Sequence, residues 1–155
     1  MKAAIRERLT SGSVRALVCA AACGADLLAL SVASDLGLRR RIVLPFAVEV
    51  FRAGSVVDRP GAYPWGELYD RFVQEARSGG DLILLGFDPH DPSVYERTNG
   101  GILDEALSMA AETHDEAEAI VVWDEERRSG HDFTGHFASE ARLRSMQVTP
   151  IAILG

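Results

Sequence analysis

The sequence predicts a doubly wound α/β domain, in which helices cover both faces of a parallel sheet. Five short apolar runs alternate with amphipathic stretches along the chain, and the runs themselves do not alternate between apolar and polar residues. Continuous runs such as Ile-Val-Leu and Leu-Ile-Leu-Leu are typical of parallel strands that are buried on both faces. The expected strands are 14–20, 41–46, 81–87, 118–123 and 148–154.

These five strands are expected to form one sheet. Strands that alternate with helices imply right-handed crossover connections. For a complete chain the simplest strand order is 2-1-3-4-5, with the switch point between the first and third strands. The third expected strand, 81–87, would then pair with the first, 14–20.

Five amphipathic stretches are expected to be helices. In the second of them, Ala25, Leu28, Val32 and Leu36 fall on one stripe, and Gly37 follows where a helix often ends in a left-handed residue. The sequence shows no repeat, low-complexity linker or domain boundary, which predicts a single domain over residues 1–155. The expected helices are 2–9, 25–36, 65–78, 99–113 and 134–145.

Composition favours a cytoplasmic globular protein. The chain is 47% hydrophobic and 25% charged, and no apolar run approaches the ~18 residues that would cross a membrane. The charged residues near the N-terminus do not suit a secretory signal. Cys19 and Cys23 have no second Cys or His pair at metal-ligand spacing, so we expect reduced thiols, no metal and no cofactor.

The charge of the chain is distributed unevenly. The formal net charge of −7 combines +3 over residues 1–77 with −10 over residues 78–155. Binding to polymeric DNA or RNA depends on neutralising many phosphates, and this chain has no basic stripe for that purpose. A small anionic ligand held by local donors remains compatible with the sequence, and so does a homo-oligomer.

The loop after the first expected strand is a candidate ligand loop. In parallel sheets the ligand binds beyond the carboxyl ends of the strands. Residues 20–26 read Ala-Ala-Ala-Cys-Gly-Ala-Asp and lead into a helix, whose first N–H groups and positive dipole end suit an anion. One glycine alone does not make a dinucleotide fingerprint. The Asp26 carboxylate either caps the helix or accepts a hydrogen bond from a ribose hydroxyl.

The long loop after the third expected strand is a second candidate. It ends in Asn99-Gly100-Gly101 at an expected helix start, where asparagine can cap and glycines expose backbone donors. Arg97 offers a planar fork to a phosphate. The alternative is an asparagine cap beside a surface arginine.

The remaining two loops give weaker signals. Phe46 or Phe51 would stack on a base, although apolar residues at this spacing also suit a core. His131 and His136 are five residues apart, a poor spacing for zinc, and Thr134 has the character of an N-cap. The sequence holds no nucleophile elbow, phosphate loop or Cys–His nucleophile pair.

Six short motifs together resemble the SLOG superfamily, a Rossmann-like group named for its DNA-processing and lonely-guy members. The likeness is nearest to SLOG-like domains of bacterial signalling proteins, and it runs from about residue 14 to the end. The motifs are Cys-Gly-Ala-Asp-Leu-Leu (23–28), Val-Leu-Pro-Phe (43–46), Phe51 with Ser55-Val56, Tyr-Glu-Arg-Thr-Asn (95–99), Val-Val-Trp-Asp (121–124) and Thr-Gly-His (134–136).

The resemblance implies a three-layer Rossmann-like sandwich that binds a nucleotide or a nucleotide-derived signal. Some members of the superfamily hydrolyse N-glycosidic or phosphoribosyl bonds. Gly24, Ala25 and Asp26 match the family's first ligand loop, and Thr134 matches its final loop. The expected ligand-binding residues are Cys23, Gly24, Ala25, Asp26, Pro45, Phe46, Arg97, Asn99, Gly100 and Thr134.

The chain departs from the family in two places. The family's opening strand and its glycine loop would precede Lys2, so the resemblance implies that the first strand is lacking. Either the visible strands close directly, which we expect, or an external segment fills the slot. The enzymes of the superfamily carry Pro-Gly-Gly-x-Gly-Thr before a catalytic glutamate, whereas residues 99–105 read Asn-Gly-Gly-Ile-Leu-Asp-Glu, with Glu105 off register.

Three functions follow as hypotheses. The leading one is a sensor domain that binds a nucleotide-derived small molecule, with Gly24 and Asn99 at the same sheet edge. The alternative is a hydrolase of N-glycosides or nucleoside monophosphates, with Asp26, Glu96 or Glu105 as acid or base. The third is a protein-interaction scaffold without a ligand. A carboxylate with a raised pKa would favour the hydrolase over the sensor.

Overall fold

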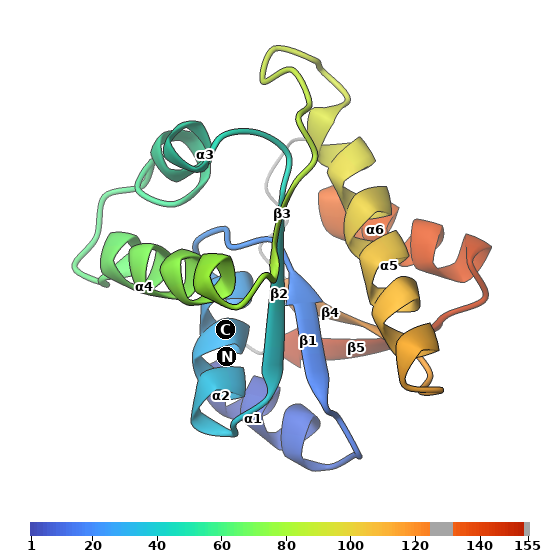
Figure 1. Cartoon of the computed structure of the whole chain (residues 1–155). Helices are drawn as coiled ribbons and strands as arrows, with labels where there is room; N and C mark the ends of the chain where they lie inside the picture. Colours follow the sequence, from blue (N-terminus) through green and yellow to red (C-terminus); the bar gives the residue numbers. More distant parts are fainter. Residues whose placement is uncertain (125–131, 154–155) are drawn as a thin grey trace. The chain divides into compact units, whose positions relative to one another are not determined.

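The computed structural model describes residues 1–124 and 132–153. The chain forms two compact units, Met1–Val94 and Tyr95–Gly155, and both alternate helices with parallel strands (Figure 1). Within the described residues, every helix is too short or too polar to span a membrane.

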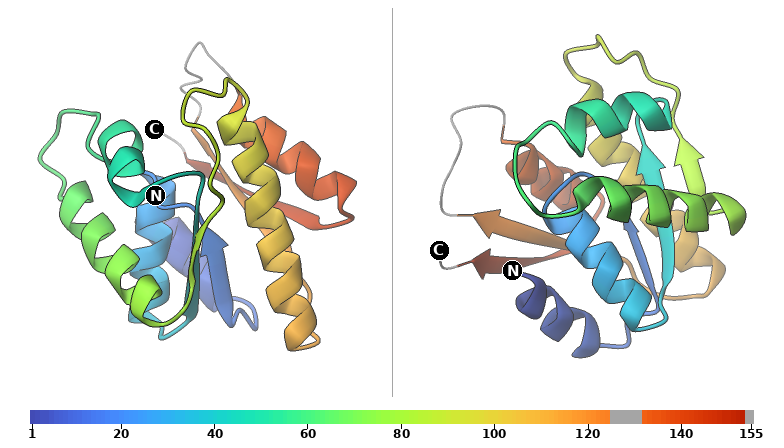
Figure 2. Two further views of the ribbon diagram at one scale, coloured as in Figure 1. Left: turned by 45° about the horizontal axis from the view of Figure 1, so that its top comes forward. Right: turned by 90° about the vertical axis from the view of Figure 1, so that its left-hand side faces the viewer.

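The first unit holds a three-stranded parallel sheet. Its elements in chain order are α1 (Lys2–Thr10), β1 (Ala16–Cys19), α2 (Ala25–Asp35), β2 (Arg39–Leu44), α3 (Val48–Ser55), α4 (Trp65–Ser78) and β3 (Leu82–Leu84). The strands lie in the order β1-β2-β3. Helices α2 and α4 lie side by side over one face of this sheet, and α1 packs against α2 (Figure 2).

The observed strand order corrects the expected one. Strand β3 pairs with β2, with Ile42 opposite Leu82 and Leu44 opposite Leu84, and does not pair with β1. The first three strands therefore follow the order 1-2-3 instead of 2-1-3, and β4 and β5 form a separate two-stranded sheet instead of extending this one. Two right-handed crossovers that step in the same direction place α2 and α4 on the same face, so this sheet has no switch point.

The core of the first unit lies between the sheet and these two helices. Ile42 and Leu44 of β2 alternate with residues that face the other way, and both are fully buried. Tyr69 and Phe72 of α4 pack against the same cluster. Burying such side chains contributes roughly 1.5–3 kcal/mol each. This packing fixes the carboxyl ends of β1 and β2. The loops that continue from these two ends are ones that were expected to bind a ligand.

Helix α3 was not expected from the sequence. It lies inside the loop 45–64 and begins at Val48, and its N-cap residue Ala47 provides no side-chain cap. Its position is set by tertiary contacts: the buried Tyr69 hydroxyl donates to the Val48 carbonyl at 2.7 Å, and Arg52 binds Asp70 through both arms of its guanidinium, at 2.9 and 3.1 Å. Long-range contacts of this kind stabilise a helix that has weak local signals.

The second unit contains β4 (Glu118–Asp124), α6 (Phe133–Leu143) and β5 (Gln147–Ile153), preceded by α5 (Val94–Glu112). Strands β4 and β5 are parallel and paired over their whole length, with Val121 opposite Pro150. Leu103 of α5 packs in one cluster with Ala119, Ala141 and Met146. A proline inside a strand is tolerated at the edge of a sheet, where the missing N–H faces away from the partner strand.

Candidate functional site

The loop that follows β1 joins the carboxyl end of the sheet to α2. The Cys23 N–H donates to the Ser55 carbonyl at 3.0 Å, which ties this loop to the end of α3. Gly24 is the N-cap of α2, has a φ of 101° and supplies no side-chain cap. A Cβ at position 24 would meet no heavy atom within 4 Å, so the constraint is conformational: only glycine adopts this φ without strain. Ala25 is the first residue of α2.

Asp26 lies in the first turn of α2 and turns back onto its own loop. Its Oδ2 accepts a hydrogen bond from the Ala22 N–H at 3.3 Å, so it does not act as the N-cap. Burial raises the pKa of Asp26 from 3.8 to about 6, and the bond from Ala22 opposes this shift. The nearby carboxylate also helps burial to raise the pKa of the Cys19 thiol, which makes that thiol a poor nucleophile.

The loop that follows β2 contributes its backbone. The Pro45 carbonyl accepts a hydrogen bond from the Phe87 N–H at 2.7 Å and so joins the ends of β2 and β3. The Phe46 ring is buried and packs against Phe51, with ring centres 6.1 Å apart. Phe46 and Phe51 are therefore core residues in this structure. The sequence left open whether they belong to a core or stack on a base.

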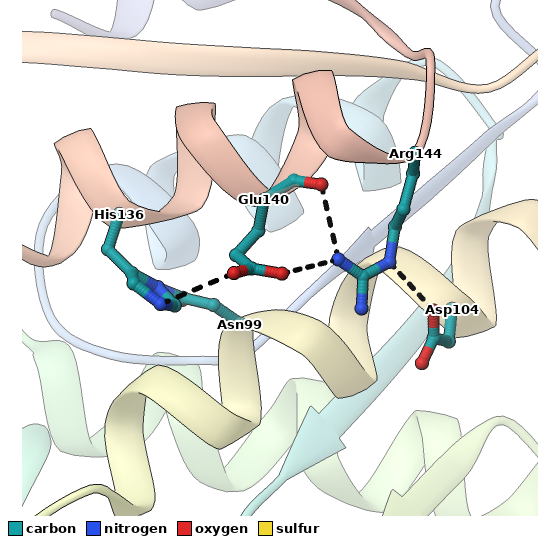
Figure 3. A network of polar contacts seen from close by, with 5 residues as sticks. All are labelled: Asn99, Asp104, His136, Glu140 and Arg144. Carbon is teal, nitrogen blue, oxygen red and sulfur yellow. Dashed lines mark hydrogen bonds and ion pairs between the residues drawn. The ribbon is translucent and has the colours of Figure 1, made fainter.

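Asn99 lies inside α5, not at its start. Helix α5 begins at Val94, so the expected cap at Asn99 and exposed backbone donors at Gly100 are wrong. The Asn99 side chain instead contacts the first turn of α6, where its Nδ2 donates to the Phe133 carbonyl at 3.1 Å. The same nitrogen lies 3.2 Å from Nδ1 of His136 (Figure 3). A donor facing Nδ1 places the proton of a neutral His136 ring on Nε2.

Asn99 is the first residue of a polar network that connects α5 with α6. Nε2 of His136 lies 3.7 Å from Glu140 Oε1, and Glu140 Oε2 accepts from Arg144 Nη1 at 2.7 Å. Arg144 Nε donates to Asp104 at 2.8 Å (Figure 3). A Cβ at Gly100 would stand 3.2 Å from Arg144 Nη2, so the glycine inside this helix makes room for the guanidinium.

Thr134 was expected to cap the last helix, and this expectation is also wrong. The cap is Asp132, whose Oδ1 accepts from the Gly135 N–H at 2.8 Å, and Thr134 follows inside the first turn. His131 lies outside the described residues. A Cβ at Gly135 would collide with the Asp132 carboxylate, which explains the glycine at this helix position.

Removing this cap is expected to destabilise the protein modestly. Asp132→Ala should lower the free energy of unfolding by about 1 kcal/mol, because a first-turn N–H loses its acceptor. Gly135→Ala should be neutral or destabilising alone, yet stabilising by about 1 kcal/mol in the Asp132→Ala background, since alanine favours a helix once the carboxylate is gone. Urea unfolding of the four proteins measures this coupling. Additive effects would show that the collision does not occur.

The structure places the expected site residues in two groups. Cys23, Gly24, Ala25 and Asp26 lie together in the first unit, near the ends of β1 and β2. In the second unit Asn99 contacts the turn of α6 that holds Thr134, while Arg97 and Glu96 lie in the opening turns of α5. That Gly24 and Asn99 share one sheet edge stays a prediction, because they belong to different units.

Sequence reasoning missed a charged cluster at the opposite edge of the first sheet. Asp81 accepts hydrogen bonds from Arg39 and Arg41, and Glu75 accepts from Arg40 and Arg71. A run of three arginines at the start of a strand was the available signal, because charged residues on inward-facing strand positions need partners. Among residues 1–124 and 132–153, no three His, Cys, Asp or Glu side chains are placed to hold a metal ion.

No family model, curated protein or solved structure matches this chain. The resemblance to the SLOG superfamily stays an expectation that rests on the six short motifs of the sequence.

Proposed function

We propose that the chain binds a nucleotide-derived small molecule at the carboxyl end of β1, with the Asp26 carboxylate accepting a hydrogen bond from a ribose hydroxyl. The observation that carries this proposal is Asp26 itself. Burial raises its pKa to about 6, so we infer that the ionised carboxylate is held at an energetic cost in the first turn of α2. Costly ionisable groups of this kind cluster at functional sites.

The surroundings of Asp26 support the same assignment. Parallel sheets present their ligand loops beyond the carboxyl ends of the strands, which is where the loop 20–24 lies. Gly24 leaves open space in front of the first turn of α2, and no side chain caps that turn. A ligand hydroxyl would supply a second hydrogen bond to a carboxylate that has one from Ala22. Such a bond favours the ionised form.

The raised pKa of Asp26 also favours a second candidate function. A carboxyl group that titrates near 6 can donate a proton to a leaving group close to neutral pH, as a hydrolase of N-glycosides requires. In this function Asp26 would protonate the departing base or its ring nitrogen. The two functions share the ligand class and differ in whether the bound molecule is cleaved.

A thermal-shift screen across nucleosides, nucleotides, ADP-ribose variants and cyclic dinucleotides tests the proposal. A ligand that binds only the folded chain raises the melting temperature. Calorimetry should then show that Asp26→Ala weakens binding of the best ribonucleotide by about tenfold or more, since a hydrogen bond to a charged group contributes ~1.5–3 kcal/mol. The matching 2′-deoxy compound should bind the wild type weakly and lose little further affinity in the variant.

Asp35 provides the control, because Asp35→Ala removes a carboxylate that is 51% exposed and lies at the other end of α2 from this loop. Unchanged affinity of Asp26→Ala for every ligand found would remove Asp26 from the site. Chromatography of the incubated ligand separates the two functions: release of a free base that is lost in Asp26→Asn indicates the hydrolase, and an intact ligand indicates the sensor.

A further inference from the structure

We propose that a pocket at the amino-terminal edge of the first sheet binds a small organic anion, whose carboxylate or phosphate oxygens engage the Nε–Nη2 edge of Arg40. The pocket lies at the edge opposite to Asp26, so this proposal is independent of the proposed function. The body of the anion would lie against Leu38 and Gly79, which line the pocket and reach its surface.

The pocket has a volume of about 200 Å³. Sites for drug-sized ligands and cofactors are typically ~300–1,000 Å³, so this one suits a smaller molecule, about the volume of seven water molecules. Its lining combines a charged rim with apolar walls. The lining residues are Leu30, Leu38, Arg39, Arg40, Phe72, Glu75, Ala76, Gly79 and Asp81.

Arg40 occupies a position that the strand pattern assigns to the core. It precedes Ile42 and Leu44 on the face of β2 that packs against α2 and α4. The guanidinium lies 5.7 Å from the centre of the Phe72 ring, and its Nη1 donates to Glu75 at 2.7 Å. Among the described residues, Arg40 Nε is a buried side-chain nitrogen that has no hydrogen-bond partner. A buried donor left without an acceptor is unfavourable, and an anion would supply one.

Two other arginines of this chain show what the Nε–Nη2 edge of a guanidinium group binds. Arg39 uses its Nε and Nη2 to bind the two oxygens of Asp81, at 3.1 and 3.0 Å. Arg52 binds both oxygens of Asp70 with the same pair of atoms. Arg40 instead donates to Glu75 through Nη1. Its Nε and Nη2, which can bind two oxygens of one anion, are then left for a ligand.

The local charge also favours an anion. Four guanidinium groups, from Arg39, Arg40, Arg41 and Arg71, surround two carboxylates, from Glu75 and Asp81. Because Arg40 Nε is shielded from solvent, the head group has to turn on its stem to meet a ligand. Its side chain is 25% exposed and that of Glu75 is 41% exposed, so both ends of this ion pair reach solvent.

Amide chemical shifts of the full chain, titrated with benzoate, phenyl phosphate and the neutral isostere benzamide, test the proposal. We expect saturable shifts at Leu38, Ala76 and Gly79 with at least one anion, and binding of benzamide weaker by about tenfold or more. The stronger of the two anions identifies the ligand class as carboxylates or phosphate esters. The same titration of Asp26→Asn should give unchanged affinity, which separates this site from the proposed function.

Two variants and one control complete the test. Arg40→Gln keeps a polar side chain without the fork and should weaken anion binding by about tenfold or more, whereas Arg6→Gln, which breaks only the exposed pair with Asp35, should not. Gly79→Leu fills the pocket from a backbone that accepts a side chain and should block binding without changing any charge. The proposal is overturned if no anion binds, if benzamide binds equally well, or if Arg40→Gln and Gly79→Leu both keep wild-type affinity.

Discussion

Replacing Asp81 with asparagine is expected to lower the free energy of unfolding at neutral pH by about 2 to 4 kcal/mol, because breaking a buried ion pair leaves charges without compensation. Asp81 accepts from Nε and Nη2 of both Arg39 and Arg41, at 3.0 to 3.2 Å. The side chains of Asp81 and Arg41 are each only 12% exposed. Through these bonds Asp81, which immediately precedes β3, fixes the beginning of β2 beside β3.

The effect of Asp81 on stability should depend on pH in a defined direction. Hydrogen bonds from Arg39, followed by those from Arg41, lower the pKa of Asp81 below 3.8 although burial opposes the shift. The stabilisation is therefore complete above pH 3.8 and is lost as the pH falls through the lowered pKa. Urea unfolding of the wild type and Asp81→Asn at pH 7 and at pH 3 measures it, and the difference between the two proteins should shrink at pH 3.

Asp70→Asn is the matched control for Asp81→Asn. Asp70 also forms a two-armed bond with an arginine, Arg52, but the side chains of Arg52 and Asp70 are 39% and 57% exposed. An exposed pair of this kind is worth about 0–1 kcal/mol. Equal losses in the two variants would show that burial of Asp81 does not strengthen its bonds.

Asp26→Asn is expected to stabilise the protein at neutral pH by roughly 1 to 3 kcal/mol, the opposite sign to Asp81→Asn. The folded chain holds the proton of Asp26 more tightly than the unfolded chain does, because burial raises the pKa to about 6. Wild-type stability therefore falls as the pH rises from about 4 to about 6. Asparagine removes that penalty and still accepts the hydrogen bond from Ala22.

Unfolding free energies measured at pH 4 and pH 7.5 test this expectation. The unfolding free energy of Asp26→Asn should exceed that of the wild type only slightly at pH 4 and by the whole expected amount at pH 7.5. The exposed Asp58→Asn should have nearly the stability of the wild type at both pH values. A destabilised Asp26→Asn at pH 7.5 would mean that the ionised carboxylate is favourable in the folded chain. That outcome would also remove the energetic cost on which the proposed ligand site rests.

Much of the secondary structure could be predicted from the sequence. The amphipathic pattern of 65–78 coincides with α4, and the apolar runs coincide with β2, β4 and β5 to within two residues at most ends. Alternation of such patterns is sufficient to predict an α/β fold with parallel strands. The strand order could not be predicted in this way. The hydrophobic pattern of β3 would be the same whether it paired with β1 or with β2, and the structure pairs it with β2.

The candidate site could be predicted only in part. The position of Asp26 after β1 follows from the chain pattern, but its raised pKa depends on burial that the sequence does not show. Asn99 was expected at a helix start because asparagine can cap a helix and the two glycines after it can expose backbone donors. The glycine at 100 instead serves Arg144, which lies 44 residues further along the chain, and no local rule detects that contact.

Pro150 has a consequence for how this protein behaves in a crowded solution. An exposed strand edge is a template onto which a strand of another molecule can add, and such addition is a common route to aggregation. Strand β5 has seven residues with Pro150 in its middle, so one backbone donor is missing from its ladder. An incoming strand would have to skip that position and lose the continuous row of hydrogen bonds that makes edge addition favourable. Pro150 thus limits the addition of a further strand to β5.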